Sequence, residues 1–350
     1  MKIHRKYMRR CIEIARNGLG TTAPNPMVGC VIVHKDKIIG EGFTSPFGGS
    51  HAEVNAINSV IDKSKLESST LYVTLEPCSH FGKTPPCTDL IIQYKIPKIV
   101  IGTTDTNRHV NGAGISKLKA SNCEVTVGVL EKECREHHKR FFTFHEKKRP
   151  FIILKWAESS DGFLSPETKA QKAPVWLTNN YSRQMVHKWR SEEQAILVGA
   201  NTVREDNPSL TVRNFVGKNP LRIVLDPNGL LDLEYKVFKG EARTLVIGHK
   251  ETTDREQDSN LIRRNIDWKD KDNIALQISN LLYSLDISSV IIEGGRITLE
   301  TFLKEGLWDE TRVFKSETLL NGGTEAPRVQ GTLTKCQQIL KDSLFVFNND

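Results

Sequence analysis

The sequence predicts two successive α/β domains, and three observations support this. At 350 residues the chain is too long for one typical core. Short apolar runs typical of buried strands alternate with segments of helical period in both halves. A charged run that ends in a proline, residues 145–150, separates the halves. We expect this run to be exposed chain between domains at residues 1–146 and 150–350.

In the first half, the period of the apolar residues predicts a helix over residues 6–16 that ends at Gly18. The apolar run 28–33 predicts a buried strand, and residues 38–43 form its hairpin partner across a polar turn. Further helices are expected at residues 51–61, 88–94 and 130–144, and further strands at 71–75, 98–102 and 124–129. Because strands are separated by helices, we expect a largely parallel sheet.

The alternation restarts after the charged run. Strands are expected at residues 151–157, 195–199, 221–225, 244–248 and 289–293, and helices at 181–190, 274–285 and 297–303. The strongly charged stretch 254–272 predicts a surface excursion.

Composition indicates the cellular location of the protein but not its function. The net charge of +7 fits a mildly basic surface, attraction of phosphorylated ligands or binding of nucleic acid, and does not decide among them. No apolar stretch approaches the roughly 20 residues of a membrane span, and no secretory signal is visible, so we expect a cytoplasmic protein. Seven irregularly spaced cysteines do not resemble a disulfide framework.

The strongest functional signal is His51-Ala52-Glu53, followed by Cys78 and Cys87, each cysteine preceded by proline. One imidazole and two thiolates form a three-ligand zinc set that leaves a fourth position for water. Glu53 suits proton transfer rather than ligation, as in zinc nucleobase deaminases. We expect His51 at the very start of a helix, because residues 51 and 53 share no face in mid-helix. Cys87 is expected in the first turn of another helix, where the thiolate is favoured.

Two other interpretations of these residues stay open. His51 could be a surface histidine and the two cysteines core thiols, or His80 could close a structural zinc shell, although Glu53 argues against the latter. Eight residues separate the cysteines, whereas the commonest deaminase pattern has two. The inserted loop is polar and cationic, so we expect it to contact substrate.

These motifs resemble the bifunctional deaminase/reductase family of bacterial riboflavin biosynthesis. Its deaminase half carries Asn-Pro-x-Val-Gly, His-Ala-Glu and Pro-Cys-Ser-His-x-Gly-(Lys/Arg)-Thr-Pro-Pro-Cys, and the chain has them at residues 25–29, 51–53 and 77–87. The resemblance implies a cytidine-deaminase-like α/β/α domain with one zinc ion and a phosphoribosylamino-diaminopyrimidinone substrate. It also implies substrate contacts from Asn25, His80 and Lys83. The chain departs from the family at Thr44, where many members have histidine.

The second half is less informative when it is taken alone. Glu293-Gly294-Gly295 ends an apolar strand before a helix, which either lets phosphate approach backbone N–H groups or is simply a tight turn. Residues 155–162 run from a strand into a turn, and residues 202–213 place polar side chains around an Asn-Pro turn. Both segments could bind a polar ligand or be solvated.

The same resemblance extends to these segments, although Ser160 stands where leucine is usual and Trp-Ile-Thr-Gly is matched only partly at residues 176–179. The reductase half of the family is similar to dihydrofolate reductase in fold and uses NADPH. The implied NADPH contacts are Ala157, Trp176, Thr202, Asp206, Gly295, Arg296, Ile297, Thr298, Leu299, Glu300 and Thr301. The implied substrate contacts are Arg190, Leu210, Arg213 and Glu293, with arginine suited to phosphate.

The expected activity is therefore hydrolytic deamination followed by NADPH-dependent reduction of the ribosyl chain to ribityl. The alternatives are a deaminase of an RNA base or free nucleoside with a C-terminal binding module, or a second half that only regulates the first. No interleaved basic-aromatic stretch indicates nucleic-acid binding. We expect a small phosphorylated pyrimidine as partner, with neither nucleic acid nor membrane; a homo-oligomer stays open, and no general acid for the reduction is evident.

Overall fold

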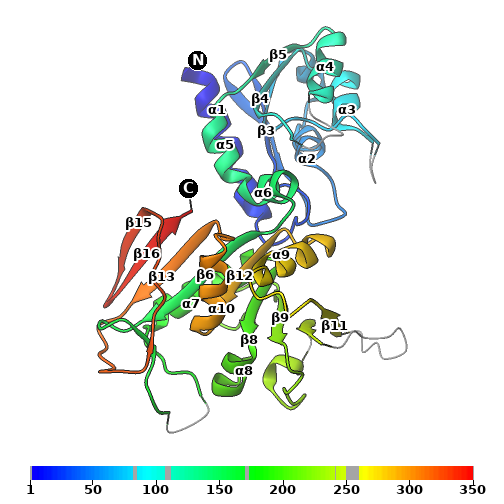
Figure 1. Cartoon of the computed structure of the whole chain (residues 1–350). Coiled ribbons are helices and arrows are strands. Elements are labelled where there is room, and N and C mark those ends of the chain that lie inside the picture. Colours follow the sequence, from blue (N-terminus) through cyan, green and yellow to red (C-terminus); the bar gives the residue numbers. More distant parts are fainter. Residues whose placement is uncertain are drawn as a thin grey trace. The chain divides into compact units, whose positions relative to one another are not determined.

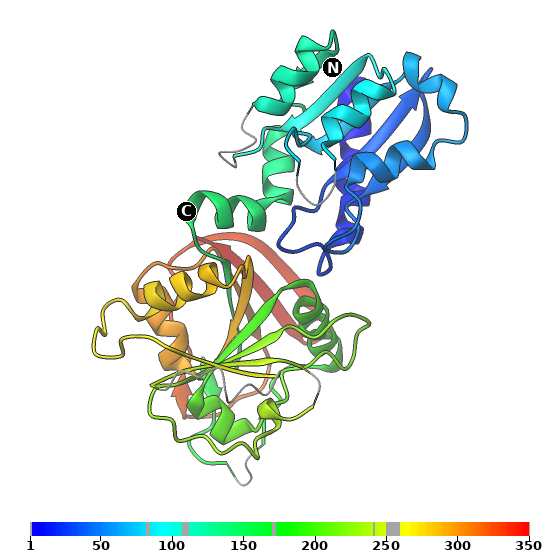
Figure 2. The same cartoon turned by 90° about the vertical axis from the view of Figure 1, so that its right-hand side faces the viewer.

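The computed structural model describes residues 2–81, 85–106, 112–169, 173–240, 242–249 and 260–349. The chain divides into two compact units, Met1–Lys148 and Arg149–Asp350, and each is described by itself (Figures 1 and 2). In the described ranges, none of the helices combines the length and the apolar character that crossing a membrane requires.

Unit 1 is a five-stranded sheet between two layers of helices. The strands are Gly29–His34 (β1), Lys37–Phe43 (β2), Thr70–Leu75 (β3), Lys98–Thr103 (β4) and Glu124–Val127 (β5), in the order β2-β1-β3-β4-β5. The β3-β4 and β4-β5 pairs are parallel, whereas β1 is antiparallel to both β2 and β3. The expectation of a largely parallel sheet is therefore wrong for half of the sheet, because a hairpin supplies its first two strands.

Successive side chains of the buried strands pack alternately against the two layers of helices. Val31 and Tyr72 pack with the helices Lys2–Ala15 (α1) and Glu131–His137 (α5) on one face. Ile32 and Val73 pack with Ala52–Ser59 (α2), Cys87–Gln93 (α3) and Ala113–Ala120 (α4) on the other. Burial on both faces explains why the strands appear as nearly continuous apolar runs. The sequence did not predict α4.

The end of unit 1 differs from expectation. The single helix predicted over 130–144 is two helices, because the chain bends at His138 before Lys139–Lys147 (α6). The His138 side chain is buried, with Nε2 3.0 Å from Thr74 Oγ, so the bend brings a polar ring into the core. The expected exposed run 145–150 is partly helical, and Arg149 and Pro150 are buried.

Unit 2 is built on a nine-stranded sheet in the order β11-β10-β9-β8-β12-β6-β13-β16-β15. Its strands are Phe151–Glu158 (β6), Ala195–Gly199 (β8), Leu221–Asp226 (β9), Thr244–Gly248 (β10), Leu261–Asn265 (β11), Ser289–Glu293 (β12), Glu310–Lys315 (β13), Thr332–Ile339 (β15) and Asp342–Asn348 (β16). Adjacent strands from β11 through β13 are parallel, and the β15-β16 hairpin is antiparallel. A separate ribbon pairs Phe163–Ser165 (β7) with Thr324–Glu325 (β14).

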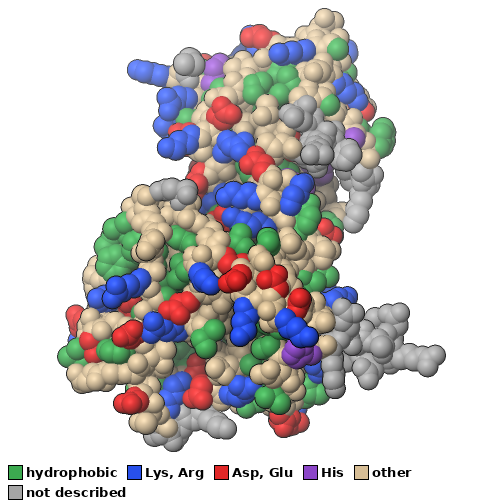
Figure 3. Space-filling model, viewed as in Figure 1, with side chains coloured by type: hydrophobic (Ala, Val, Ile, Leu, Met, Phe, Trp, Pro, Cys, Tyr) green, Lys and Arg blue, Asp and Glu red, His purple; other side chains and the backbone are tan. Residues whose placement is uncertain are grey.

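Helices cover both faces of this sheet. Asn180–Glu192 (α7) and Ala200–Asp206 (α8) pack on the face that carries Ile153 and Val198. Ile274–Ser284 (α9) and Arg296–Lys304 (α10) pack over the main core on the opposite face (Figure 1). Positive and negative side chains are interspersed over unit 2 on the face shown in Figure 3, which favours the mildly basic surface.

The sequence missed α8 and six strands, β7, β11, β13, β14, β15 and β16, and in β13 polar residues hide the burial. β13 has the sequence Glu-Thr-Arg-Val-Phe-Lys, yet its first five residues are buried. Arg312 donates to Glu310 at 2.6 Å and lies over the Trp189 ring, 4.5 Å from its centroid. β11 lies inside the predicted surface excursion 254–272, as a parallel edge strand next to β10.

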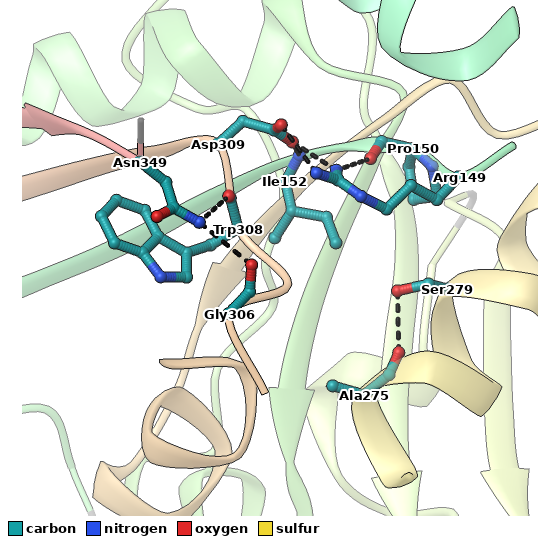
Figure 4. Close-up of polar contacts among 9 residues, drawn as sticks. All are labelled: Arg149, Pro150, Ile152, Ala275, Ser279, Gly306, Trp308, Asp309 and Asn349. Atoms are coloured by element: carbon teal, nitrogen blue, oxygen red, sulfur yellow. Dashed lines mark hydrogen bonds and ion pairs between the residues drawn. The ribbon is translucent and has the colours of Figure 1, made fainter. Parts of the chain in front are cut away.

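The first residues of unit 2 are fixed to the turn that precedes β13, as Figure 4 shows. Arg149 donates two hydrogen bonds to Asp309, at 2.5 and 2.8 Å, and Asp309 also accepts from the Ile152 N–H at 2.9 Å. Asn349 donates from Nδ2 to the carbonyl oxygens of Gly306 and Trp308. Both ends of the unit therefore attach to the turn before β13.

Candidate metal centre and cofactor cleft

His51 lies immediately before α2, with extended backbone, as the spacing of residues 51 and 53 predicts. Glu53 is in the first turn of α2 and only 4% exposed. The helix can lie this close to the sheet because β2 has glycine at position 42. A Cβ there would be 2.3 Å from the backbone nitrogen of Ala56.

The two cysteines approach His51 from the segments that follow β3. Cys78 comes three residues after that strand, and Cys87 is the first residue of α3. The Cys87 N–H donates to Cys78 Sγ at 3.3 Å. His51 Nδ1 lies 3.3 Å from Cys87 Sγ and 3.6 Å from Cys78 Sγ, and the three ligand atoms lie within 4.8 Å of one another.

This geometry fits a zinc ion. Tetrahedral zinc bound to imidazole nitrogen and thiolate sulfur separates the two ligand atoms by about 3.5 Å, given the usual bond lengths. The observed nitrogen–sulfur distances of 3.3 and 3.6 Å bracket that value. They also identify Nδ1 as the ligating nitrogen of His51, which the sequence could not specify.

The ionisation of the cluster also suits a metal cation. A hydrogen bond from Cys87, with a smaller contribution from His51, lowers the pKa of the Cys78 thiol to about 4. Burial, followed by the charge of Cys78, raises the pKa of Glu53 to about 7. A bound cation would ionise both thiols and displace the proton that they share.

The cluster has three members among the residues that the structure describes, and His80 is not one of them. His80 is exposed, so it does not close a four-ligand shell. A three-ligand site leaves one position for water, which is the arrangement of catalytic rather than structural zinc.

The expected substrate contacts of unit 1 are only partly described. Asn25 is half-buried in the loop before β1, and Lys83 lies outside the described residues. Thr44 Oγ accepts from the Val28 N–H at 3.0 Å, and its own N–H donates to the Val28 carbonyl. Thr44 is therefore buried and fixes the loop that carries Asn25.

In unit 2, a cleft of about 1310 Å³ lies at the carboxyl ends of β6, β8, β9 and β12. This is where open parallel sheets bind ligands. The expected cofactor and substrate residues that line it are Ala157, Trp176, Arg190, Thr202, Asp206, Leu210, Arg213, Glu293, Gly295, Arg296, Ile297, Thr298 and Thr301. Leu299 and Glu300 do not line it: the helical period turns Leu299 into the core, and Glu300 pairs with Arg296.

The glycine turn is less available to a phosphate than the sequence suggests. Thr202 Oγ accepts from the Gly295 N–H at 2.9 Å, so one of the backbone donors of the turn already has a partner. Asp206 is also paired, through Oδ1, with Lys169 Nζ at 2.6 Å. The Arg183 guanidinium lies over the exposed Trp176 ring, 4.8 Å from the ring centroid.

Two of the expected substrate residues bond each other. Arg190 donates to both carboxylate oxygens of Glu293, at 3.2 and 2.8 Å, and Lys155 Nζ lies 3.7 Å from Glu293 Oε2. Burial opposes ionisation of Glu293, but the two cations outweigh it and hold its pKa at about 2. The Leu210 side chain is in the core, so only its backbone can face the cleft.

Lys155 and His187 line this cleft, and from the sequence neither of them was assigned a role. Burial lowers the pKa of Lys155, a lysine in the cleft that Glu293 holds in place. His187 accepts a hydrogen bond from the Arg213 N–H, and the charges of Arg190 and Arg213 both act on it. The Lys-x-Ala segment could have indicated Lys155, whereas no pattern marks His187 within α7.

The geometry defines a zinc site with an open fourth position in unit 1 and an open α/β sheet with a ligand cleft at its carboxyl edge in unit 2. Comparison with protein families gives the same division. Residues 1–103 match the cytidine and deoxycytidylate deaminase zinc-binding region, and residues 150–344 match the RibD C-terminal domain.

Relatives of known name match nearly the whole chain. The riboflavin biosynthesis protein RibD of Aquifex aeolicus is 42% identical over 330 residues, which cover 92% of this chain and 89% of the relative. That of Synechocystis is 39% identical, with coverage of 93% and 88%. The crystal structure of a diaminohydroxyphosphoribosylaminopyrimidine deaminase/5-amino-6-(5-phosphoribosylamino)uracil reductase from Thermotoga maritima has a TM-score of 0.89 at 36% identity, covering 100% and 99% of the two chains.

The chain belongs to the RibD family. It is a bifunctional enzyme of riboflavin biosynthesis, with a zinc-binding deaminase domain and a reductase domain that uses NADPH. The expected fold class is confirmed, with a cytidine-deaminase-like and a dihydrofolate-reductase-like domain. The alternative of an RNA-base or nucleoside deaminase with a binding module is not favoured.

Proposed function

We propose that unit 1 deaminates diaminohydroxyphosphoribosylaminopyrimidine and that unit 2 reduces the ribosyl chain of the deaminated product, 5-amino-6-(5-phosphoribosylamino)uracil. The observation that carries this proposal is the His51, Cys78 and Cys87 cluster with Glu53 buried beside it, in one chain with the reductase cleft. The Thermotoga maritima relative is named for both activities.

In the deaminase site, we assign His51, Cys78 and Cys87 as the zinc ligands. When bound, zinc supplies a water of lowered pKa. Glu53 would take up a proton as the water attacks and pass it to the amino nitrogen that leaves as ammonia. Burial gives its carboxyl a pKa near neutrality, which suits a group that both accepts and donates a proton, although a bound cation would lower that pKa. Asn25, His80 and Lys83 are proposed to orient the substrate.

In the reductase cleft, NADPH supplies the hydride, and the protein orients the reactants. We assign the cofactor to Ala157, Trp176, Thr202, Asp206 and the start of α10. Arg213 is exposed in the cleft, which suits it to the substrate phosphate.

Lys155 is the candidate general acid of the reduction. Its side chain is 14% exposed in the cleft, its pKa is lowered by partial burial, and Glu293 lies 3.7 Å away. A lysine of lowered pKa gives up its proton more readily than an ordinary one. Arg190 holds Glu293 and so keeps Lys155 in position.

We also propose a cytoplasmic location. None of the seven cysteines forms a disulfide, which fits a reducing compartment.

The test follows both reactions in one purified sample. Ammonia release should require the diaminopyrimidine, and NADPH oxidation, read from the absorbance of the reduced cofactor, should begin only after deamination. With the deaminated pyrimidine supplied directly, Glu53→Gln should oxidise NADPH normally, whereas its release of ammonia from the earlier substrate should be strongly reduced. Oxidation of NADPH before deamination would reverse the proposed order, and NADPH binding without oxidation would make unit 2 a regulatory module.

A further inference from the structure

The loop that contains Arg213 has a strained backbone conformation, which contacts with surrounding residues must stabilise. It follows α8, and two of its non-glycine residues have left-handed backbone: Asn207 with φ 42° and Leu210 with φ 55°. Leucine adopts such a conformation only where surrounding contacts compensate its strain. Leu210 is 3% exposed and packs with Val203 and Val224, which anchors the middle of the loop.

The end of the loop is held by His187 of α7. The side chain is buried, and its Nδ1 accepts the Arg213 N–H at 3.2 Å. A ring nitrogen that accepts a hydrogen bond carries no proton, so the imidazole is neutral. Burial, followed by the charges of Arg190 and Arg213, lowers the pKa of His187 to about 4, against an opposing effect of Glu293. The ring therefore stays an acceptor throughout the neutral range.

A second contact from α7 lies one turn further along the helix. Arg190 Nη1 donates to the Thr211 carbonyl oxygen at 3.4 Å, while its other nitrogens bond Glu293. The neighbouring Val212 N–H donates to Asn219 Oδ1 at 2.8 Å. Three consecutive backbone units before and at Arg213 thus have defined partners.

We propose that His187 is a positioning residue of the reductase, whose neutral imidazole fixes the Arg213 backbone so that the guanidinium meets the phosphate of the substrate. The inference rests on the proposed function, in which Arg213 binds that phosphate. An arginine side chain loses conformational entropy when it is ordered by a ligand. If its backbone is already fixed, less entropy is lost on binding. His187 contacts neither reacting atom in this scheme, so it acts through Arg213.

The test compares His187→Leu with His187→Asn. Leucine removes the acceptor and leaves the Arg213 N–H without a partner, so KM for the phosphorylated pyrimidine should rise roughly tenfold. The larger part of the effect should fall on KM rather than kcat. Asparagine can place its Oδ1 close to the position of Nδ1 and should restore most of the lost affinity. Lys188→Gln, on the exposed side of the same helix, is the matched control.

Two further measurements separate positioning from a general structural role. A pyrimidine riboside that lacks the phosphate should bind His187→Leu and the unaltered enzyme equally. In an Arg213→Ala background, His187→Leu should have no additional effect, because the path to the phosphate is already broken. Equal losses for both ligands, or fully additive effects of the two substitutions, would overturn the proposal.

Calorimetric titration of the phosphorylated pyrimidine keeps this test independent of turnover. Binding that is lost in Arg213→Ala but intact in His187→Leu would refute the role of His187 and leave the proposed function standing. If the unaltered enzyme binds the phosphorylated pyrimidine in a phosphate-dependent way but never oxidises NADPH, the proposed function is refuted instead. If His187→Leu fails to fold, His187→Gln, whose amide reaches beyond the position of Nδ1, should show the same raised KM.

Discussion

Replacing Asp309 by asparagine should destabilise unit 2 strongly. The Asp309 carboxylate accepts three hydrogen bonds, two from Arg149 and one from the Ile152 N–H. The side chains of Arg149 and Asp309 are only 10% and 7% exposed. Asparagine keeps the size and one acceptor but leaves a buried guanidinium without its counter-charge. Breaking such a pair costs about 3–5 kcal/mol of unfolding free energy.

Tryptophan fluorescence during urea unfolding measures this loss. All 5 tryptophans of the chain lie in unit 2, so the signal reports on that unit alone. With a slope of about 1–3 kcal/mol per molar urea, the midpoint should fall by at least roughly 1 M. The control is Asp272→Asn at the Lys304–Asp272 pair, whose side chains are 76% and 86% exposed. An exposed pair is worth less than about 1 kcal/mol.

Equal midpoints for Asp309→Asn and the control would refute the reasoning, because Arg149 would then behave as a screened surface charge. The result also bears on separating the units. A C-terminal fragment that begins at Lys148 retains Arg149, whereas one that begins at Phe151 leaves Asp309 without it. We expect the longer fragment to be the more stable of the two.

Four further outcomes are expected. Glu53→Gln should retain zinc by metal analysis while deamination falls about 10²–10⁴-fold, and loss of zinc would make Glu53 a ligand. The unaltered protein should bind one zinc per chain, and a Cys78→Ser, Cys87→Ser variant should bind none. Gly295→Ala should leave the melting temperature unchanged, because the new Cβ is 3.6 Å from Thr202 Oγ and φ is −61°. It should raise KM for NADPH if cofactor phosphate approaches the turn, and an unchanged KM would refute that approach. Burial lowers the pKa of His138 well below its usual value, so the unfolded chain binds the proton first and unit 1 should lose stability as pH falls below about 6.5. His138→Gln should reduce that loss in circular-dichroism melts at pH 7.5 and 5.5; an equal loss would assign it to other groups.

The elements that the sequence predicted best are buried strands with runs of apolar residues. β1, β3 and β12 each contain a run of three apolar residues, and their observed bounds lie within one residue of the expected ones. β13 escaped prediction because its charges are neutralised inside the fold, with Arg312 paired to Glu310 and placed over Trp189. The break at His138 escaped because its cause is a polar contact with Thr74, 64 residues earlier.

The candidate sites follow the same distinction. The zinc cluster was predictable because each ligand belongs to a short motif, and the local structure fixes two of them, His51 and Cys87, at the start of a helix. In the reductase cleft, by contrast, the expected residues were identified singly, and their pairing appears only in three dimensions. Arg190 and Glu293 are 103 residues apart in sequence yet neutralise each other.

That pairing changes what each residue can do. Because Arg190 already bonds Glu293, its charge is largely compensated inside the cleft, and Arg213 is the more available cation for a phosphate. The Glu293 carboxylate pairs with both Arg190 and Lys155. It therefore reduces the repulsion between the Lys155 ammonium and the Arg190 guanidinium. In the proposed function, phosphate binding therefore belongs to the exposed loop and proton transfer to Lys155 of β6, because the two positions differ in burial and pairing.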